Sequence, residues 1–179
     1  MKKIAQIVLI FFVYHIAAQE KMVSYIGIIN FEASIPLFEE VKAINDKTTC
    51  ILITKTGEIA CWVNIKDFKF KRDLMQEHFN ENYMESNRFP RAVFKGKIDR
   101  FNLKNLSSES NHCQIIGKIT LRGRTKKIVI NGTLKKVGKG IELYSVFPLN
   151  TDDFNIEIPF IVRSKISKNV NTELICVLQ

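Results

Sequence analysis

Apolar and polar residues follow two different periods in succession between Arg72 and Ile98, and this stretch anchors the prediction for the rest of the chain. Its first half repeats apolar residues at the spacing of one helix face, namely Leu74, Met75, Phe79, Tyr83 and Met84. Pro90 ends this helix, because the residue before a proline is pushed out of the helical region. The second half predicts a strand with one dry face, formed by Ala92, Phe94, Gly96 and Ile98.

The chain after Val23 predicts a meander of strands with two helical interruptions. A short helix is expected over Pro36–Ala43, with proline in its first turn, and Thr56-Gly57 indicates a two-residue hairpin turn. Eight antiparallel strands with one dry face each can close into a barrel, although the pattern alone also permits a sandwich. The eight predicted strands are Val23–Ala33, Cys50–Lys55, Glu58–Ile65, Arg91–Phe101, Cys113–Arg122, Lys126–Val137, Ile141–Leu149 and Thr172–Leu178.

Several blocks of the chain resemble the YceI-like family of secreted, lipocalin-like lipid-binding proteins. The stretch LMQEHFNENYMESNRFPRAVFKG (residues 74–96) is similar to nearly all of that family's central signature. Two further blocks follow in the family's order, GKITLRGRTKKIVI at Gly117–Ile130 and DDFNIEIP at Asp152–Pro159, and GIINFEASIP at Gly27–Pro36 precedes them. The resemblance implies an all-β fold, an eight-stranded antiparallel lipocalin-like β-barrel with one longer helix and a short helix. It also implies a long-chain ligand inside the barrel, a polyisoprenoid, isoprenoid quinone or fatty-acyl chain.

The inward positions of the strands are apolar and rich in phenylalanine. Composition alone favours a packed core, whereas the family resemblance makes these residues the lining of a ligand cavity. Glycines in or near strands would give such a cavity room, and they are Gly27, Gly96, Gly117 and Gly132. The bulky pair Cys61-Trp62 would instead narrow or fill the barrel. The expected lining residues are Phe31, Leu52, Phe94, Ile98, Ile119, Leu121, Ile130, Phe147 and Leu174.

The N-terminal residues have the pattern of a targeting segment. Met1-Lys2-Lys3 is basic, Ile4–Ile16 is mostly apolar, and Ala17-Ala18 supplies small residues for cleavage before Gln19. The apolar run is short for a transmembrane helix. We therefore expect a signal peptide over residues 1–18, one lipid-binding barrel domain over residues 19–179, and a periplasmic or secreted location.

No constellation of residues points to an enzyme, a metal site or a resident cofactor; a bound lipid or isoprenoid quinone is the one small molecule expected. His78 has no second ligand at metal-binding spacing, so a helix-surface or capping role is favoured. Asp152-Asp153 are adjacent and point apart on an extended segment, which favours a turn over paired acid-base chemistry. No G-x-S-x-G motif frames a nucleophile.

The formal net charge is +9, and one basic group lies at a strand junction, with Arg122, Arg124, Lys126 and Lys127. An ordinary solvated surface is the favoured interpretation of this charge. If the charge binds a partner, an anionic membrane surface or a ligand phosphate is favoured over nucleic acid. A filled barrel would instead serve as a periplasmic stress-related or partner-binding module. Outward apolar residues allow a homodimer, among them Ile26, Ile28, Val129, Tyr144 and Val146.

Four cysteines in an exported chain allow three disulfide pairings. With a two-residue hairpin turn, Leu52 lies opposite Cys61, and Cys50 is diagonal to it. That separation favours free, partly buried thiols over a disulfide. The partners of Cys113 and Cys176 stay open.

Overall fold

The computed structural model describes residues 20–179, so the predicted signal peptide lies outside the described residues. Nine strands form one antiparallel sheet. They are β1 (Lys21–Ser34), β2 (Lys42–Ile53), β3 (Glu58–Asn64), β4 (Lys69–Phe70), β5 (Arg91–Ile98), β6 (Asn111–Leu121), β7 (Arg124–Val137), β8 (Gly140–Asn150) and β9 (Ile166–Leu178).

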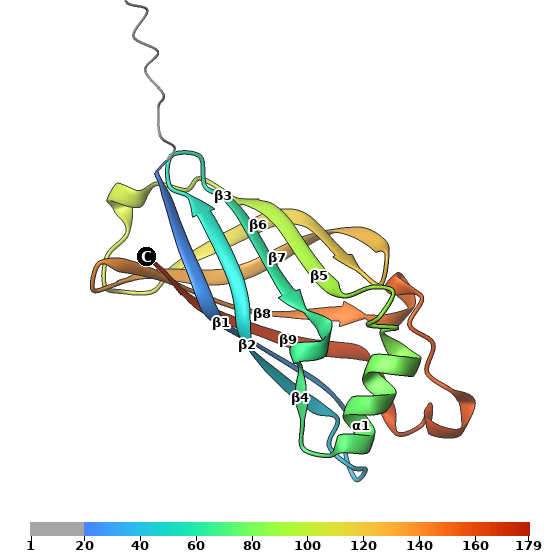
Figure 1. Ribbon diagram of the computed structural model, residues 1–179. Coiled ribbons are helices and arrows are strands. Elements are labelled where there is room, and N and C mark those ends of the chain that lie inside the picture. The colour runs from blue at the N-terminus through green and yellow to red at the C-terminus, as the bar shows by residue number, and fades with distance from the viewer. Residues whose placement is uncertain (1–19) are drawn as a thin grey trace, which may run out of the picture.

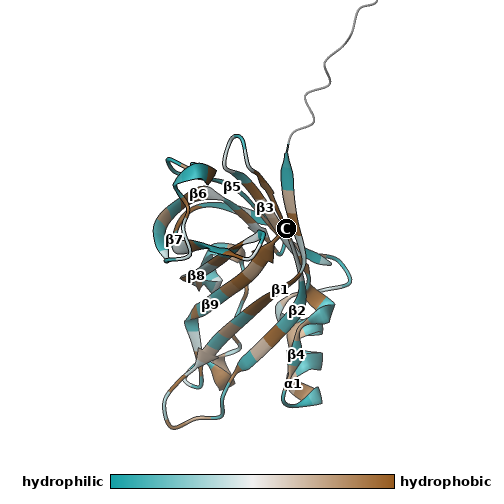
Figure 2. Cartoon of the chain, turned by 90° about the vertical axis from the view of Figure 1, so that its left-hand side faces the viewer, coloured by the Kyte–Doolittle hydropathy of each residue, from teal (hydrophilic) through white to brown (hydrophobic). Residues whose placement is uncertain are grey.

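The sheet closes into a barrel because β1 pairs with β9 on one side and with β2 on the other. The order around the barrel is β1, β9, β8, β7, β6, β5, β3 and β2, and the two-residue β4 attaches to β2 as an additional strand (Figure 1). Hydrophilic and hydrophobic residues alternate along β1 and β9 (Figure 2). The predicted eight-stranded antiparallel barrel is therefore confirmed.

The predicted helix is also confirmed, but it changes its hydrogen bonding halfway. α1 (Asp73–His78) continues directly into η2 (Phe79–Tyr83), a π-helical turn. The Met84 N–H donates to the Phe79 carbonyl, which matches the five-residue step between these two apolar side chains. Glu85 then adopts a left-handed conformation with φ 47°, so the helix ends before Pro90 is reached.

The short helix predicted over Pro36–Ala43 is wrong. Leu37 has a φ of 73°, a left-handed conformation that interrupts a right-handed helix. The Phe38 N–H donates to the Ile35 carbonyl in a turn, and Lys42 already pairs with Glu32 of β1. Residues 35–41 are therefore the connection between two long strands. The short helices that do form are 3-10 turns: η1 (Ile65–Asp67), η3 (Leu103–Asn105), η4 (Thr151–Phe154) and η5 (Phe160–Val162).

The β2–β3 hairpin differs from its prediction by its loop length. Ile53 pairs with Glu58, so the loop has the four residues between them and not the two that were assumed. This shifts the register and places Cys50 directly opposite Cys61, where the two form a disulfide. The prediction of free thiols is wrong for this pair, whereas Cys113 and Cys176 are free.

Two apolar clusters divide the interior into halves. The closed half, at the end that carries the β2–β3 loop, is filled by aliphatic side chains around the disulfide, and its most buried members are Leu52, Ile98, Ile141, Leu143 and Leu178, each at most 1% exposed. The open half, at the end that carries α1, has a smaller buried cluster with partly buried aromatic residues packed against it. Its buried members include Val63, Ile65, Phe68, Met84 and Phe154.

The glycines on β5 and β6 do not open the barrel, contrary to expectation. Gly96 and Gly117 face each other across the two strands. A Cβ atom at Gly117 would lie 2.6 Å from the Phe94 ring, and one at Gly96 would lie 2.8 Å from it. The missing side chains thus make room for the Phe94 ring, which packs against the core of the closed half.

Candidate functional site

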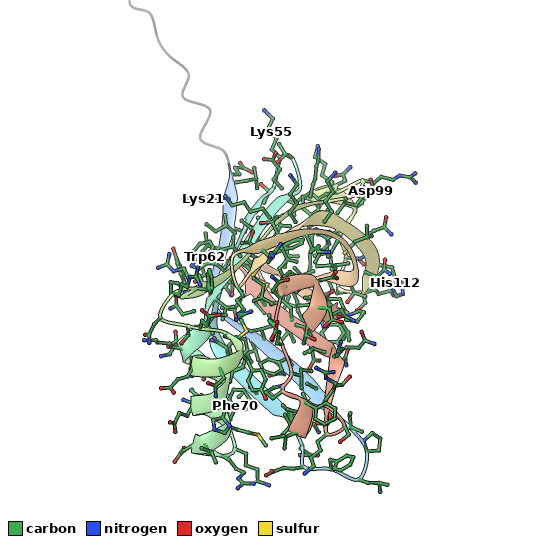
Figure 3. All side chains as sticks on the ribbon, turned by 90° about the vertical axis from the view of Figure 1, so that its right-hand side faces the viewer. Lys21, Lys55, Trp62, Phe70, Asp99 and His112 are labelled. Atoms are coloured by element: carbon green, nitrogen blue, oxygen red, sulfur yellow. A yellow bond between two sulfur atoms is a disulfide. The ribbon has the colours of Figure 1, made fainter. Side chains whose placement is uncertain are left out.

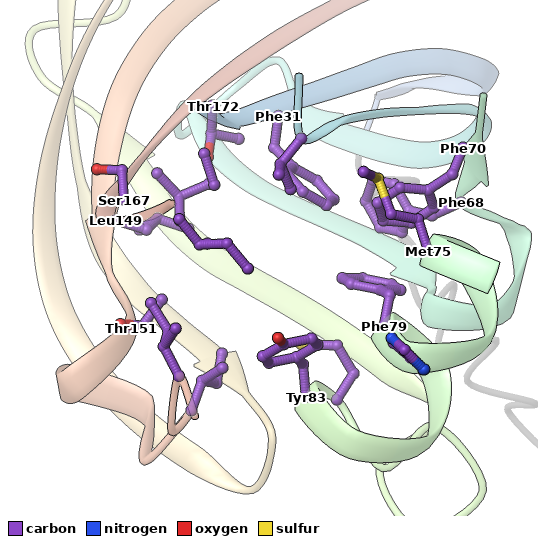
Figure 4. Close-up of a pocket in the computed structure, with 18 of the residues that line it drawn as sticks. Phe31, Phe68, Phe70, Met75, Phe79, Tyr83, Leu149, Thr151, Ser167 and Thr172 are labelled. Atoms are coloured by element: carbon purple, nitrogen blue, oxygen red, sulfur yellow. The ribbon is translucent and has the colours of Figure 1, made fainter. Parts of the chain in front are cut away.

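A cavity of about 410 Å³ occupies the open half of the barrel (Figure 4). This volume lies within the range of roughly 300–1,000 Å³ that small-molecule pockets have. Its inner wall consists of apolar side chains from β1, β3, β5, β6 and β8. They include Ile29, Phe31, Val63, Ala92, Ile119, Leu121, Phe147 and Leu149.

Aromatic rings build the wall beneath the helix. Phe31 from β1 stacks on Phe79 from η2 with 5.4 Å between ring centroids, and its ring meets the edge of Phe68 at 5.3 Å. Phe70 of β4 lies 5.0 Å from Phe79. Such ring pairs contribute about 0.5–1.5 kcal/mol each beyond their buried area. The short strand β4 and the helix are therefore held to the barrel by the same rings that line the cavity.

The mouth of the cavity lies between α1, residues 35–41 and residues 159–165. The exposed side chains of Glu39, Arg72 and Lys165 are among its lining residues, as is exposed His78. Arg72 donates a hydrogen bond to the Glu39 carboxylate, an ion pair that joins the β1–β2 connection to the helix. That hydrogen bond raises the pKa of the Arg72 guanidinium. Charged groups are therefore confined to the entrance.

Polar groups inside the cavity are few and neutral. Burial raises the pKa of Tyr83, so its phenol is uncharged at neutral pH, and its ring lies across the cavity from Thr172 (Figure 4). The buried Thr151 hydroxyl has no hydrogen-bond partner within residues 20–179. The interior can thus accept an apolar chain with, at most, a few neutral oxygen atoms.

Arg122 fixes the loops that complete the wall. Its guanidinium donates to the Glu85 carboxylate, just beyond the helix, and to the Asn155 carbonyl, just beyond η4. The Arg122 side chain is only 17% exposed, so this residue does not belong to a basic surface. The predicted basic cluster is reduced further because Lys126 pairs with Asp153. These contacts hold Ile156 and Ile158 against the cavity.

The turn predicted at the two acidic residues of this loop is present, since both lie in η4. Asp152 pairs with Lys168, and Asp153 pairs with Lys126, so the two carboxylates point apart within the turn η4. Within residues 20–179, no group of three or more His, Cys, Asp or Glu side chains is placed to hold a metal ion. The same part of the chain has no helix both long and apolar enough to cross a membrane.

The comparison with protein-family models decides the family of this chain. The model of the YceI-like domain matches residues 14–177. The chain belongs to the YceI-like family. The predicted resemblance is thereby confirmed over almost the full length of the barrel.

Solved structures share the fold of this YceI-like domain at low sequence identity. A polyisoprenoid binding domain from Saccharophagus degradans superimposes with a TM-score of 0.76 at 13% identity, covering 89% of this chain and 97% of that one. BcnA from Burkholderia cenocepacia gives a TM-score of 0.70 at 14% identity, covering 84% and 95%. The YCEI protein of Campylobacter jejuni gives 0.53 at 14% identity, covering 99% and 98%. No curated protein sequence matched the chain significantly.

The nine residues predicted to line the cavity of this YceI-like barrel do not all lie in one half of it. Phe31, Ile119, Leu121 and Phe147 line the cavity. Leu52 and Ile98 are fully buried in the closed half, away from it. The other three border a small void of about 60 Å³ that shares Ile119 and Phe147 with the cavity, and they are Phe94, Ile130 and Leu174.

Sequence reasoning missed the lining residues outside the eight strands. Met75, Phe79 and Tyr83 carried a usable signal, because they form the apolar stripe of the helix. Ile156 and Ile158 alternate within the third family block and point the same way. Phe68 and Phe70 alternate too, but this segment is too short to give a strand pattern.

Proposed function

We propose that this protein binds one long-chain amphiphile, such as a polyisoprenoid, an isoprenoid quinone or a fatty-acyl chain, in the open half of its barrel. The observation that carries the proposal is the apolar cavity of about 410 Å³, whose charged lining residues stand only at its mouth. The YceI-like family and the name of the Saccharophagus degradans domain support the same ligand class.

The cavity suits a slender apolar chain in energy as well as in shape. Each buried methylene contributes roughly 0.8 kcal/mol, so about ten of them offset a large part of the roughly 4–15 kcal/mol that association costs. The closed half ends the cavity, and only the void of about 60 Å³ extends beyond Ile119 and Phe147. The tail therefore enters from the mouth and stops at the packed core.

The mouth is where a headgroup would stay in contact with water. Glu39, Arg72 and Lys165 provide both signs of charge there, and Tyr83 provides a neutral hydroxyl further in. A quinone ring or an alcohol headgroup carries no net charge, so hydrogen bonds to such residues are sufficient to hold it. A carboxylate or phosphate headgroup would favour Lys165, which has no ion-pair partner within 4.0 Å among residues 20–179.

Export of the chain to the periplasm or the cell exterior is part of the same proposal. The basic and apolar pattern of residues 1–18 supports it. The Cys50–Cys61 disulfide supports it as well, because disulfides persist in oxidising compartments. N-terminal sequencing of the protein from cell fractions tests it, and an intact Met1 in a cytosolic fraction would contradict it.

Native mass spectrometry followed by organic extraction tests ligand binding. We expect a stoichiometric adduct that extracts as an isoprenoid or acyl chain, or binding of added quinone or fatty acid if the purified protein is empty. Absence of both results would contradict the proposal and favour a partner-binding module.

A single substitution should block the cavity selectively. Ala92 points into the cavity from β5, so Ala92→Phe places a ring where the chain would lie. We expect at least about a tenfold loss of affinity, since one displaced pair of methylenes corresponds to roughly 1.6 kcal/mol. The matched control is Ala60→Phe on the neighbouring β3, because Ala60 lies between the inward-facing Ile59 and Cys61 and so faces outward. Equal affinities for the two variants would place the ligand elsewhere.

A further inference from the structure

Two loops at the mouth end of the barrel carry large apolar side chains that contact little of the protein. Leu37 is 103% exposed and Phe38 is 45% exposed at the tip of the β1–β2 connection. Phe160 and Ile161 are 83% and 84% exposed in η5, ahead of β9. We call these four residues the rim tips.

The rim tips lie beside the cavity mouth on two separate loops. Ser34 at the end of β1 pairs with Ile166 at the start of β9, so both loops leave the barrel at the same place. Glu39 from one loop and Val162 from the other line the cavity. This end of the molecule lies opposite the end that carries Lys21 and Lys55 (Figure 3).

The backbone conformation at Leu37 indicates that the exposure of its side chain serves a function. A left-handed conformation such as its φ of 73° costs a residue with a side chain about 1–2 kcal/mol. No packing offsets that cost, because the side chain is fully exposed. The turn therefore presents a leucine to the surroundings at some expense in stability, although glycine or asparagine would suit the conformation better.

Unpaired positive charge stands beside the rim tips. Arg163 and Lys165 lie two and four residues after Ile161, and within residues 20–179 neither has an acidic partner within 4.0 Å. Protruding apolar tips with free cations next to them are the combination that binds the interface of an anionic bilayer.

We propose that the rim tips, with Arg163 and Lys165, dock the protein on an anionic lipid bilayer with the cavity mouth facing the lipid. The apolar residues sit on two separate tips next to the opening, a shape that suits insertion between headgroups better than contact with a flat protein face. Docking lets an apolar chain pass between bilayer and cavity without crossing water. This use of docking rests on the proposed ligand binding, whereas docking itself is measured without any cavity ligand.

Sedimentation with lipid vesicles tests the docking. We expect the signal-peptide-free protein to bind vesicles of equal parts phosphatidylcholine and phosphatidylglycerol, and to bind pure phosphatidylcholine vesicles much more weakly. Phe160→Ser/Ile161→Ser should reduce the partition coefficient about tenfold or more. Arg163→Gln/Lys165→Gln should reduce it about fivefold per charge at low salt, with a smaller effect at high salt.

The matched control is Tyr25→Ser/Ile26→Ser on β1. These residues are also adjacent, aromatic and aliphatic, and 71% and 81% exposed. They lie at least eight residues from Ser34 along the strand, or roughly 26 Å or more at about 3.3 Å per residue, and we expect this variant to bind vesicles like the parent. Thermal unfolding midpoints near that of the parent would show that all variants are folded.

Three outcomes would overturn the docking proposal. The first is an absence of vesicle binding by the parent protein, even if it binds a lipid in its cavity. The second is an equal loss in the rim and control variants. The third is a concentration-dependent dimer that the Phe160→Ser/Ile161→Ser variant abolishes, because a second copy would then cover the rim tips. Failure of ligand binding alone, with vesicle binding intact, would refute the proposed function and leave docking standing.

Discussion

The two halves of the barrel share the same strands but differ in how their interior is filled. In the closed half, aliphatic side chains from opposite walls meet, and residues such as Leu52 and Leu178 are 0% exposed. In the open half, the facing walls are lined by half-buried side chains such as Phe31 and Leu121, and a cavity of about 410 Å³ separates them. One barrel thus contains a solid core at one end and a cavity at the other.

Strand length explains the difference. β1 and β9 have 14 and 13 residues, whereas β3 and β5 have only 7 and 8. Where the short strands end, the long strands face no partner wall, and the helix with η2 covers the gap (Figure 1). A helix lies further from a facing strand than a strand of the same barrel would, and aromatic rings bridge only part of that distance. The cavity is therefore a consequence of replacing strand by helix in one half of the wall.

The largest expected effect comes from truncating the same residue type in both halves. Leu52→Ala creates a void in a packed core and should lower the free energy of unfolding by about 3 kcal/mol. Leu121→Ala enlarges a space that already exists, so little new cavity is created, and we expect about 1 kcal/mol. Urea unfolding of the ligand-free variants measures both. Equal losses would mean that the open half is as tightly packed in solution as the closed half.

Removal of the disulfide should have the next largest effect. Cys50 and Cys61 are 11 positions apart, and closing a loop of this size stabilises a protein by about 2–3 kcal/mol. The double variant Cys50→Ala/Cys61→Ala should lose that amount in urea unfolding. It should still bind ligand with unchanged affinity, because the disulfide lies in the closed half. Cys113→Ala, which removes a free thiol, is the control.

Thiol titration with dithionitrobenzoate provides the check on which cysteines are paired. Burial raises the pKa of Cys176 to about 12, and it also raises the pKa of Cys113, so both free thiols stay protonated and react slowly in the native protein. Two thiols should react after denaturation, and four after denaturation with reduction. Four reactive thiols before reduction would show that the disulfide is absent.

The barrel was predictable from sequence because apolar residues recur at every second position along most of its strands. β5 shows this best, since Ala92, Phe94 and Ile98 point inward as their two-residue spacing requires. The helix was predictable from its apolar stripe. The family blocks then selected a barrel over a sandwich, which alternation cannot do.

The division of the barrel into a closed and an open half was not predictable from sequence. It depends on the lengths of strands and loops and on contacts between residues that are distant in the chain. A hairpin loop of four residues in place of two moved Cys50 opposite Cys61, and no local pattern specifies that choice. From sequence, Gly96 suggests extra room inside the barrel, but in the structure the Phe94 ring occupies the space where a side chain of residue 96 would begin. The left-handed turn at Leu37 overrides the helical signal of the proline before it.

The smallest expected effect concerns an exposed ion pair that links β4 to β2 in the open half. The hydrogen bond from Lys69 lowers the pKa of Asp46 below its ordinary value of 3.8. A carboxyl group with a lowered pKa in the folded state stabilises the protein above the unfolded value, and this contribution is lost as the pH falls through the folded value. Both side chains are about half exposed, so solvent screens the pair strongly.

Asp46→Asn should therefore lower the thermal unfolding midpoint slightly at neutral pH and low salt. The difference from the parent should shrink with added salt. It should also disappear as the pH falls below 3.8 and through the folded pKa of Asp46, because the parent carboxyl is then neutral too. Lys135 and Glu142 pair on β7 and β8 with less exposure, 35% and 20%, so Glu142→Gln should cost more. A larger loss for Asp46→Asn than for Glu142→Gln at neutral pH would mean that β4 is anchored mainly by this ion pair and not by the aromatic rings that line the cavity. A difference that grows in acid would contradict an ion-pair origin of the effect.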